Sequence, residues 1–305
     1  MPAVVFNNVY KAYKTGRRLT WALQGASFTV PEGKTTGFIG PNGSGKTTSF
    51  KLITGVARPT RGTVEVLGGD PWSDPGVRGM IGFLPERPVY PSNVTVEKLV
   101  TTYARIKGGT PREALRIAKT MGLAGHLDKQ VSGLSRGYLQ RLGLTLALIG
   151  DPTLLVMDEP TANLDPNARV ELLDMIKAIA RDIGATVLIS SHILAEVREV
   201  IDYIVIVKEG AVVDYGSIGE ISARYEGRVI YLVDTSDPRR LMRIMVDYDP
   251  VEGVVSWGGR VEIHVDAPRR SEVEEVLESL AREGLISSYT IKASDLYEVY
   301  RRAVG

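Results

Sequence analysis

The sequence lacks cysteine and carries almost no net charge. Its 305 residues include 0 Cys, and the formal net charge is +1 at pH 7. Without cysteine there can be no disulfide and no thiolate ligand for zinc or an iron–sulfur cluster. A nearly neutral chain gives no electrostatic reason to expect nucleic acid as its main partner.

Long hydrophobic runs are also missing. No stretch approaches the ~18 consecutive apolar residues of a membrane-spanning helix. The first residues, MPAVVFNNVYKAYK, indicate a strand followed by a polar turn rather than a secretory signal. We therefore expect a protein that is soluble when isolated and that needs another chain for any role at a membrane.

The first three quarters of the chain have an α/β pattern. Strand-like runs alternate with amphipathic helical patterns up to about residue 225, which predicts one domain over residues 1–225. Four short apolar runs are candidate buried strands: 35–39, 153–157, 186–190 and 203–207. From about 93 to 150 the pattern is helical instead. One helix there is predicted to begin at Thr110, because Pro111 and Glu113 complete a capping sequence.

A second, smaller domain is predicted over residues 226–305. Its pattern is strand, helix, strand, strand, helix, strand, at 228–233, 238–246, 251–257, 260–265, 270–282 and 287–291. This βαββαβ order is the ferredoxin-like α+β arrangement. A last helix is predicted at 294–302. His264 falls in a strand pattern, which indicates a structural residue.

One segment fits the phosphate-binding loop G-x-x-x-x-G-K-[ST], with a predicted strand before it and a helix after it. It consists of Gly40, Pro41, Asn42, Gly43, Ser44, Gly45, Lys46 and Thr47. Glycines let backbone N–H groups converge on phosphate oxygens. Lys46 would reach the β- and γ-phosphates, Thr47 would ligate Mg²⁺, and Thr48 would line the site. The alternative is a glycine-rich turn with an incidental lysine.

The segment LLVMDEP supplies two acids after a candidate buried strand. Ligand groups collect beyond the carboxyl ends of parallel strands. Asp158 would therefore hold Mg²⁺ through water, and Glu159 would act as the general base on an attacking water. Two solvated acids are the alternative, but the phosphate loop favours hydrolysis of Mg-ATP.

The segment LSRGY, from Leu134 to Tyr138, begins another predicted helix. Ser135 is a strong N-cap, and the free N–H groups after it attract an anion. The alternative is an ordinary capped helix whose leucines face the core. The order of phosphate loop, helical insert, Ser-x-Gly helix start, Asp-Glu strand, NLDP and SSH resembles the ATPase subunit of an ATP-binding cassette (ABC) transporter over residues 1–225.

This resemblance implies further nucleotide contacts. Ser135 and Gly137 match the residues that contact the γ-phosphate of ATP bound to the opposite subunit, and His192 matches a γ-phosphate contact in the same subunit. Asp165 matches a loop that communicates across the dimer, although it is also a good helix N-cap. Tyr13 matches the aromatic residue that stacks on adenine, and Tyr10 is the alternative candidate for this contact.

Three positions depart from the family pattern. The usual signature is Leu-Ser-Gly-Gly-Gln, whereas this chain has Arg136 in place of a glycine and Tyr138 in place of the glutamine. Arg136 could reinforce phosphate binding or crowd the dimer interface. Glu86 stands where a glutamine couples Mg²⁺ to the transmembrane partner. Its carboxylate would bind Mg²⁺ more strongly but adds negative charge beside the γ-phosphate.

The resemblance implies a motor subunit that binds ATP and Mg²⁺. Two copies, or this chain and a relative, would sandwich two ATP molecules and drive a separate transmembrane permease at the cytoplasmic face of the membrane. The segment from SSHILAEV to VVDYG is similar to exporter-type subunits. The 226–305 domain would regulate or stabilise the dimer. The alternative is a soluble ABC ATPase of DNA repair or translation, but such relatives usually carry cysteine clusters, long coiled coils or two cassettes.

Overall fold

In the computed structural model, two compact units divide the chain between Tyr215 and Gly216. We call them unit 1 and unit 2. The division lies before the predicted domain boundary at residue 225, because helix α8 (Ile218–Glu226) groups with unit 2. The structure describes residues 2–16, 18–162, 164–226, 228–257, 260–291 and Tyr300. The predicted helix at 294–302 lies, apart from Tyr300, outside these residues.

The main sheet of unit 1 has six strands in the order β5-β6-β7-β3-β8-β9. Its strands are β3 (Thr35–Ile39), β5 (Ile81–Leu84), β6 (Leu154–Met157), β7 (Thr186–Ser191), β8 (Tyr203–Lys208) and β9 (Ala211–Ser217). Strands β3, β6 and β7 are fully buried and pair in parallel, so their carboxyl ends meet at one edge of the sheet. The four predicted strands all lie in this sheet.

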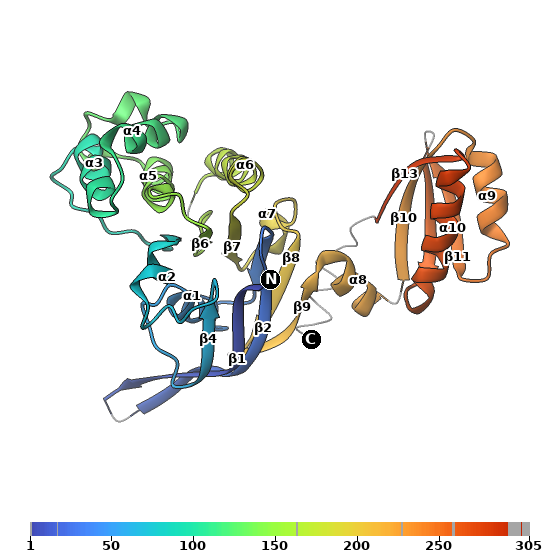
Figure 1. Cartoon of the computed structure of the whole chain (residues 1–305), viewed down its shortest axis with the longest axis horizontal. Helices are drawn as coiled ribbons and strands as arrows, with labels where there is room; N and C mark the ends of the chain where they lie inside the picture. The colour runs from blue at the N-terminus through green and yellow to red at the C-terminus, as the bar shows by residue number, and fades with distance from the viewer. Residues whose placement is uncertain are drawn as a thin grey trace. The chain divides into compact units, whose positions relative to one another are not determined.

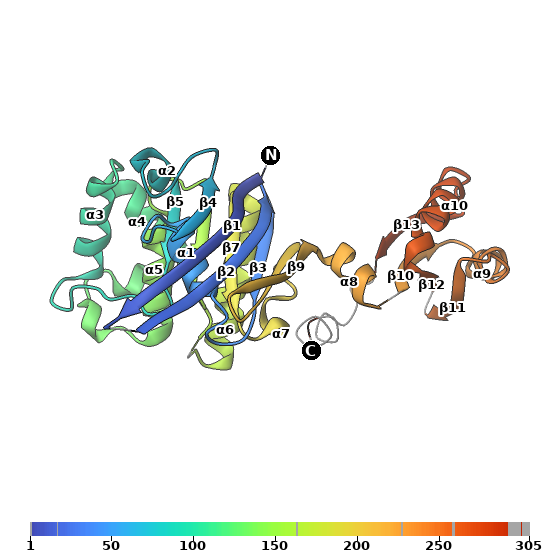
Figure 2. The same cartoon turned by 90° about the horizontal axis from the view of Figure 1, so that it is seen from below.

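A second sheet of unit 1 is antiparallel, in the order β2-β1-β4 (Figures 1 and 2). It comprises β1 (Pro2–Thr15), β2 (Arg18–Pro31) and β4 (Arg61–Val66). The predicted polar turn within the first fourteen residues is wrong. Strand β1 continues because it pairs with β2 as far as Thr15↔Arg18, and a register shift between Phe6 and Val9 accommodates the polar pair Asn7-Asn8.

A ladder of aromatic rings joins the two sheets of unit 1. Phe6 of β1 stacks on Phe28 of β2 with ring centroids 4.4 Å apart. Phe28 meets Phe38 of β3 edge-on, and Phe38 meets Phe50 of helix α1 (Lys46–Ile53) in the same way. Such pairs add stabilisation beyond the area that they bury. Helix α1, which follows the phosphate loop, is thereby held between the sheets.

The region between β5 and β6 is helical, as predicted (Figure 1). It contains α3 (Val96–Ile106), α4 (Pro111–Thr120), η1 (Ala124–His126), η2 (Val131–Gly133) and α5 (Arg136–Leu148). Thr110 caps α4, since its hydroxyl accepts the Glu113 N–H at 3.2 Å. The remaining helices of unit 1 are α2 (Pro75–Gly79), α6 (Pro166–Ile183) and α7 (Leu194–Val197).

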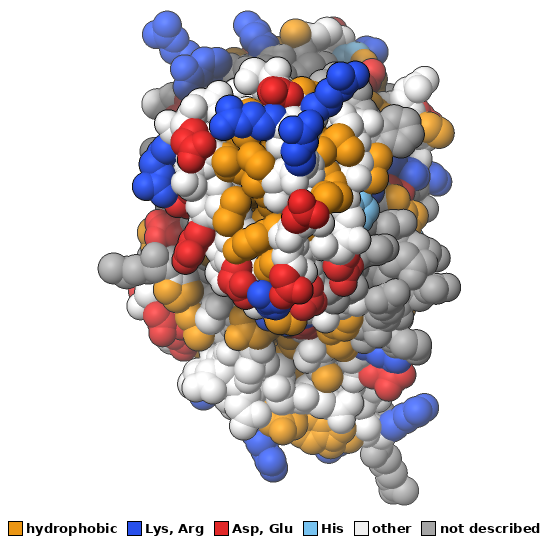
Figure 3. Space-filling model, turned by 90° about the vertical axis from the view of Figure 1, so that its right-hand side faces the viewer, with side chains coloured by type: hydrophobic (Ala, Val, Ile, Leu, Met, Phe, Trp, Pro, Cys, Tyr) orange, Lys and Arg blue, Asp and Glu red, His pale blue; other side chains and the backbone are white. Residues whose placement is uncertain are grey.

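Unit 2 has one antiparallel sheet in the order β11-β12-β10-β13. The strands are β10 (Arg228–Thr235), β11 (Val251–Trp257), β12 (Arg260–Asp266) and β13 (Ile286–Ile291). Besides α8, the other described elements are α9 (Pro238–Val246), η3 (Ala267–Arg269) and α10 (Arg270–Arg282). This is the βαββαβ arrangement that the sequence predicts. Its core is apolar. Hydrophobic side chains also gather on the face of unit 2 seen in Figure 3, with charged side chains of both signs around them.

Candidate functional site

A cavity in unit 1 lies at the carboxyl ends of β3, β6 and β7 and has a volume of about 660 Å³. Its lining includes residues of the phosphate loop, Glu86 after β5, Glu159 after β6, His192 after β7 and Tyr13 of β1. The parallel pairing of the strands brings together groups that are more than a hundred residues apart in the chain.

The phosphate loop is shaped for close approach of its backbone. A Cβ on Gly40 would lie 2.1 Å from the Val207 carbonyl oxygen, and Gly45 has a φ of 110° that favours glycine. Gly43 has a φ of 80° and open space around it. The Ser44 hydroxyl is buried without a hydrogen-bond partner among the described residues. This open, donor-rich cradle fits a phosphate chain.

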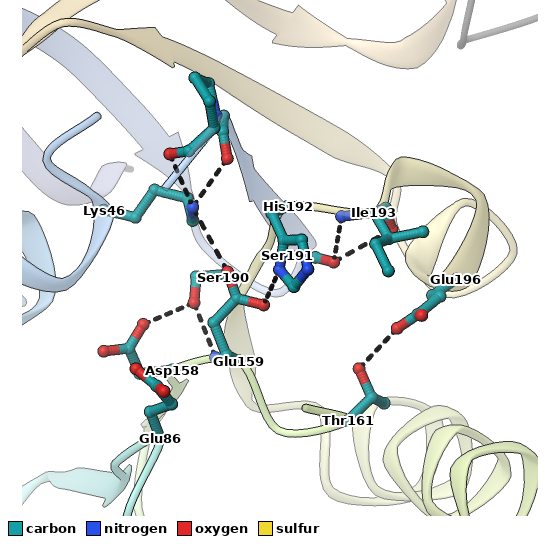
Figure 4. Close-up of polar contacts among 12 residues, drawn as sticks. Lys46, Glu86, Asp158, Glu159, Thr161, Ser190, Ser191, His192, Ile193 and Glu196 are labelled. Carbon is teal, nitrogen blue, oxygen red and sulfur yellow. Dashed lines mark hydrogen bonds and ion pairs between the residues drawn. The ribbon is translucent and has the colours of Figure 1, made fainter. Parts of the chain in front are cut away.

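Lys46 is buried at the first position of α1. Its Nζ donates to the carbonyl oxygens of Gly40 at 2.7 Å and Pro41 at 3.2 Å. The same nitrogen lies 3.3 Å from Glu159 Oε1 (Figure 4). The lysine therefore connects the phosphate loop to the acids that follow β6.

Asp158 directly follows the buried strand β6. Its Oδ1 accepts the Ser190 hydroxyl at 2.6 Å. Burial raises the pKa of Asp158, and the nearby charges of Glu159 and Glu86 raise it further, while hydrogen bonds from Ser190 and Thr47 oppose the shift. Hard oxygen donors of this kind suit Mg²⁺. Among the described residues no group of three or more His, Cys, Asp or Glu could hold a metal alone, so a magnesium ion here would need further oxygens such as those of phosphates.

Glu159 has a strained backbone and a closely surrounded side chain. Its φ is 47°, a left-handed value that is rare for a residue other than glycine. Its N–H donates to Ser190 Oγ at 2.8 Å, and its Oε2 lies 2.8 Å from His192 Nδ1. The side chain is 10% exposed and points toward Lys46 and His192 (Figure 4). Strain of this kind gathers at functional sites.

The predicted signature residues lie elsewhere in unit 1. Ser135, Arg136, Gly137 and Asp165 line a separate cavity of about 350 Å³ beside α5 and α6. Ser135 caps α5 by accepting the N–H of residue 138 at 3.5 Å, and Asp165 caps α6 by accepting that of residue 168 at 3.0 Å. The helix caps proposed from the sequence are therefore present. A signature facing a second subunit is compatible with this separation from the phosphate loop.

Glu86 follows β5 and lines the main cavity. It forms an ion pair with its neighbour Arg87 at 3.3 Å. Glu86 and Arg136, two of the departures from the family pattern, both line a third cavity of about 440 Å³. Their opposite charges thus face the same cleft.

Tyr13 lines the main cavity and is 38% exposed, with Lys11 Nζ 5.0 Å from the ring centroid. Its rival Tyr10 packs its ring edge-on against Trp21 instead.

Sequence reasoning missed several polar residues that organise this site. Ser190 joins Asp158 to the Glu159 backbone, and Glu196 contacts Thr161 at 2.8 Å. These contacts depend on the pairing of β6 with β7, which brings the segments after the two strands together and which the local sequence does not encode. The serine pair directly before His192 was the one available signal.

Comparisons with known proteins agree on one family. A family model described as ABC transporter matches residues 23–162, and one described as AAA domain, putative AbiEii toxin, Type IV TA system, matches residues 129–198. The bacitracin transport ATP-binding protein BcrA of Enterococcus faecalis is 30% identical over 90% of this chain and 89% of its own length. The lantibiotic transport ATP-binding protein SrtF of Streptococcus pyogenes is 34% identical over 73% of this chain and 96% of its own.

The fold agrees with solved structures as well. A dimeric, post-hydrolysis structure of the ATP-binding cassette MJ0796 with ADP and Pi superposes with a TM-score of 0.65 and 26% identity, covering 70% of this chain and 98% of the other. These transport proteins give no support to the alternative of an ATPase of DNA repair or translation. No helix in the described parts of the chain has the length and apolar character needed to cross a membrane.

Proposed function

This chain belongs to the family of ABC transporter ATP-binding subunits, and we propose that Glu159 is the general base of its ATPase reaction. The observation that carries this assignment is the position of the Glu159 carboxylate, 3.3 Å from Lys46 Nζ and 2.8 Å from His192 Nδ1. A base must be oriented and lie beside the groups that bind the γ-phosphate. His192 and Lys46 supply such groups on either side.

The phosphate loop would bind the nucleotide. Backbone N–H groups of residues 40–48 would contact the phosphates, and Lys46 would exchange its contacts with loop carbonyls for phosphate oxygens. Tyr13 would stack on the adenine, since its ring lines the same cavity.

We assign Mg²⁺ to Thr47 and Asp158, with Glu86 beside them. The influence of the Thr47 side chain on Asp158, whose pKa it lowers by hydrogen bonding, supports this assignment because it indicates that the two side chains are neighbours. Bound Mg²⁺ would neutralise the charge of the phosphates. It would also offset the repulsion among Asp158, Glu159 and Glu86.

The second half of the site would come from another subunit. Ser135, Arg136 and Gly137 begin α5 on a cavity separate from the phosphate loop, so these residues are available to a nucleotide held by a partner. Asp165 lines that cavity too. The partner would be a second copy or a related ATP-binding subunit.

The dimer would drive a separate transmembrane permease at the cytoplasmic face of the membrane. The names of BcrA and SrtF, which describe bacitracin and lantibiotic transport, favour export. The accessory region, residues 226–305, would regulate or stabilise the dimer through its surface. Co-purification of the tagged chain with an integral membrane protein tests the permease.

The general base is tested by the molar mass of Glu159→Gln in solution, by size exclusion with light scattering, with and without Mg-ATP. With Mg-ATP, the variant without its base should keep ATP bound and shift from monomer to dimer. Its rate of ATP turnover should fall at least ~100-fold. The matched control adds Ser135→Arg, which should bind ATP and remain monomeric. ATP hydrolysis by Glu159→Gln near the parental rate would overturn the assignment of the base. A constant mass with ATP bound would overturn the homodimer.

A further inference from the structure

Glu196 lines the nucleotide cavity but has no role in the function proposed above. It is in α7, four residues after His192, and its side chain is only 11% exposed. Its two oxygens have different partners. Oε2 accepts the Thr161 hydroxyl at 2.8 Å, and Oε1 forms an ion pair with Arg169 Nη1 at 2.6 Å (Figure 4 shows the Thr161 contact).

These contacts tie together both ends of the turn between β6 and α6. Thr161 is 2% exposed and lies two residues after Glu159. Arg169 is in the first turns of α6, and its Nη2 also donates to the Leu164 carbonyl oxygen at 3.4 Å. Glu196 is therefore bonded to the start of the turn directly and to its end through Arg169.

Two side-chain contacts connect the segment after β6 with the segment after β7. Glu159 contacts His192, and Thr161 contacts Glu196. His192 and Glu196 are held in a fixed relation, because the Ser191 hydroxyl accepts the N–H of Ile193 at 2.9 Å and donates to its carbonyl oxygen at 3.0 Å. The two contacts together form a rigid frame around residues 159–161.

This frame has a specific task at Glu159. A left-handed backbone at a glutamate persists only where its surroundings over-determine it. Ser190 fixes the N–H of Glu159 on one side. On the other side the Glu159 carbonyl oxygen accepts the Ala162 N–H at 3.0 Å, and Glu196 holds the side chain of Thr161 between them.

We propose that Glu196, with Arg169 and Thr161, is a positioning residue that fixes the conformation of Glu159 and links it to the turn carrying Asp165. This inference rests on the assignment of Glu159 as the base. A misplacement of about 1 Å in a catalytic group can lower the rate ~100-fold. This clamp, formed by Glu196, Arg169 and Thr161, would therefore act mainly on turnover. Its three side chains line the cavity, but none belongs to the phosphate loop that would hold the nucleotide.

The test uses the full chain and compares Glu196→Ala with Glu196→Gln. In steady-state ATPase assays well below the melting temperature, Glu196→Ala should lower kcat about 10- to 100-fold, with KM and the Kd of Mg-ATP changed less than about twofold. Glu196→Gln retains an oxygen that accepts from Thr161 and should recover part of the lost kcat. Arg169→Ala combined with Glu196→Ala should cost no more than Glu196→Ala alone, because both remove one link.

The matched control is Glu199→Ala. Glu199 also joins the α7 region to α6, through an ion pair with Lys177 at 3.0 Å, but its side chain is 80% exposed. Exposed pairs of this kind contribute little. We expect kcat of the control to stay at the parental value.

The outcomes separate this inference from the proposed function. If Glu159→Gln abolishes hydrolysis while Glu196→Ala and Glu196→Gln keep the parental kcat, the clamp is wrong and the base stands. If Glu159→Gln keeps hydrolysis, the proposed function fails. Should Glu196→Ala not fold, Glu196→Gln decides alone: a parental kcat overturns the clamp, and a lowered kcat with unchanged Mg-ATP affinity supports it. Equal losses in kcat and in affinity would also overturn it.

Discussion

Units 1 and 2 differ most in what they bury. Nearly all buried polar or charged side chains among the described residues belong to unit 1, including Lys46, Asp158 and Glu159, whereas the one in unit 2 is Ser222 of α8. The left-handed backbones at residues other than glycine, within the described ranges, are also all in unit 1. Unit 2 instead keeps its charges at the surface, as in the Arg260–Asp234 pair.

This difference indicates what each unit is for. Buried polar groups cost free energy unless they are hydrogen-bonded, so the burial of the three charged residues Lys46, Asp158 and Glu159 at one site reflects chemistry rather than stability. Unit 2 has an apolar core of strand and helix residues, and its described part contains no comparable buried cluster.

The largest effect on stability is expected in the core of unit 2. Leu277 of α10 is fully buried there. Leu277→Ala should lower the free energy of unfolding of unit 2 by about 2–5 kcal/mol, through lost burial and the cavity left behind. Hydrogen exchange resolved by peptide would measure this loss, and ATP hydrolysis should not change.

Val246→Ala is the control for this comparison. Val246 is on the outer side of α9 and is 61% exposed. Its replacement should change stability by less than about 0.5 kcal/mol. If Leu277→Ala also reduced ATP turnover in the folded protein, the functional separation of the units would be wrong.

A smaller loss of stability with a large loss of turnover is expected at Ser190. Ser190→Ala would leave Asp158 Oδ1 and the Glu159 N–H without their partner in a buried site. The expected cost is about 1–3 kcal/mol of unfolding free energy, and turnover should fall ~10- to 100-fold because the base is displaced. Chemical denaturation and ATPase assays would measure the two effects.

Thr54→Val serves as the control in unit 1. The Thr54 hydroxyl donates to the Phe50 carbonyl oxygen at the end of α1, away from the acids. Its loss should cost about 1 kcal/mol and leave turnover unchanged. A Ser190→Ala enzyme with parental turnover would show that the polar core of unit 1 does not position the base.

A third effect is expected at Glu86, where the apparent affinity for Mg²⁺ should change about 2- to 10-fold. Glu86→Gln removes a charge that raises the pKa of Asp158 and keeps the size of the side chain. If Glu86 contributes to metal binding, the variant should need about 2- to 10-fold more Mg²⁺ for half-maximal activity at fixed ATP, within the range expected for loss of one weak ion contact.

Magnesium titrations of Glu86→Gln and of the control Glu65→Gln, on the exposed side of β4, would test this. The control should match the parental protein. An unchanged magnesium requirement in Glu86→Gln would remove Glu86 from the metal site.

The accuracy of sequence-based prediction followed the range of the interactions. Helix α9 was predicted at its observed bounds, because Asp237 caps it and Pro238 opens it locally. The phosphate loop and the Asp-Glu pair could also be identified from local patterns. The extent of β1 depends on pairing with β2, and the contacts of Ser190 and Glu196 join residues more than thirty positions apart. No local pattern encodes such contacts.

The smallest effect is expected at Tyr231, the largest fully buried side chain of unit 2. Its hydroxyl donates to Glu274 Oε1 at 2.7 Å. Burial raises the pKa of Tyr231, and the hydrogen bond to Glu274 raises it further. The unfolded chain loses this proton near pH ~10, whereas the folded chain keeps it. The stability that the neutral tyrosine contributes is therefore complete below about pH 10 and is lost as the pH rises above that value.

Tyr231→Phe cannot ionise, so its unfolding free energy should be about 1 kcal/mol lower at neutral pH but should fall less steeply above pH ~10. Denaturation of unit 2 followed from pH ~8 to ~11.5 would measure both slopes. Unit 1 is the internal control, because burial raises the pKa of Tyr90 there and its alkaline loss should persist in the variant. Equal alkaline slopes for parent and variant in unit 2 would show that ionisation of Tyr231 does not limit the stability of unit 2. Tyr289, which packs against the same core and whose pKa burial also raises, would then be the group to replace next before unit 2 is called free of buried titration.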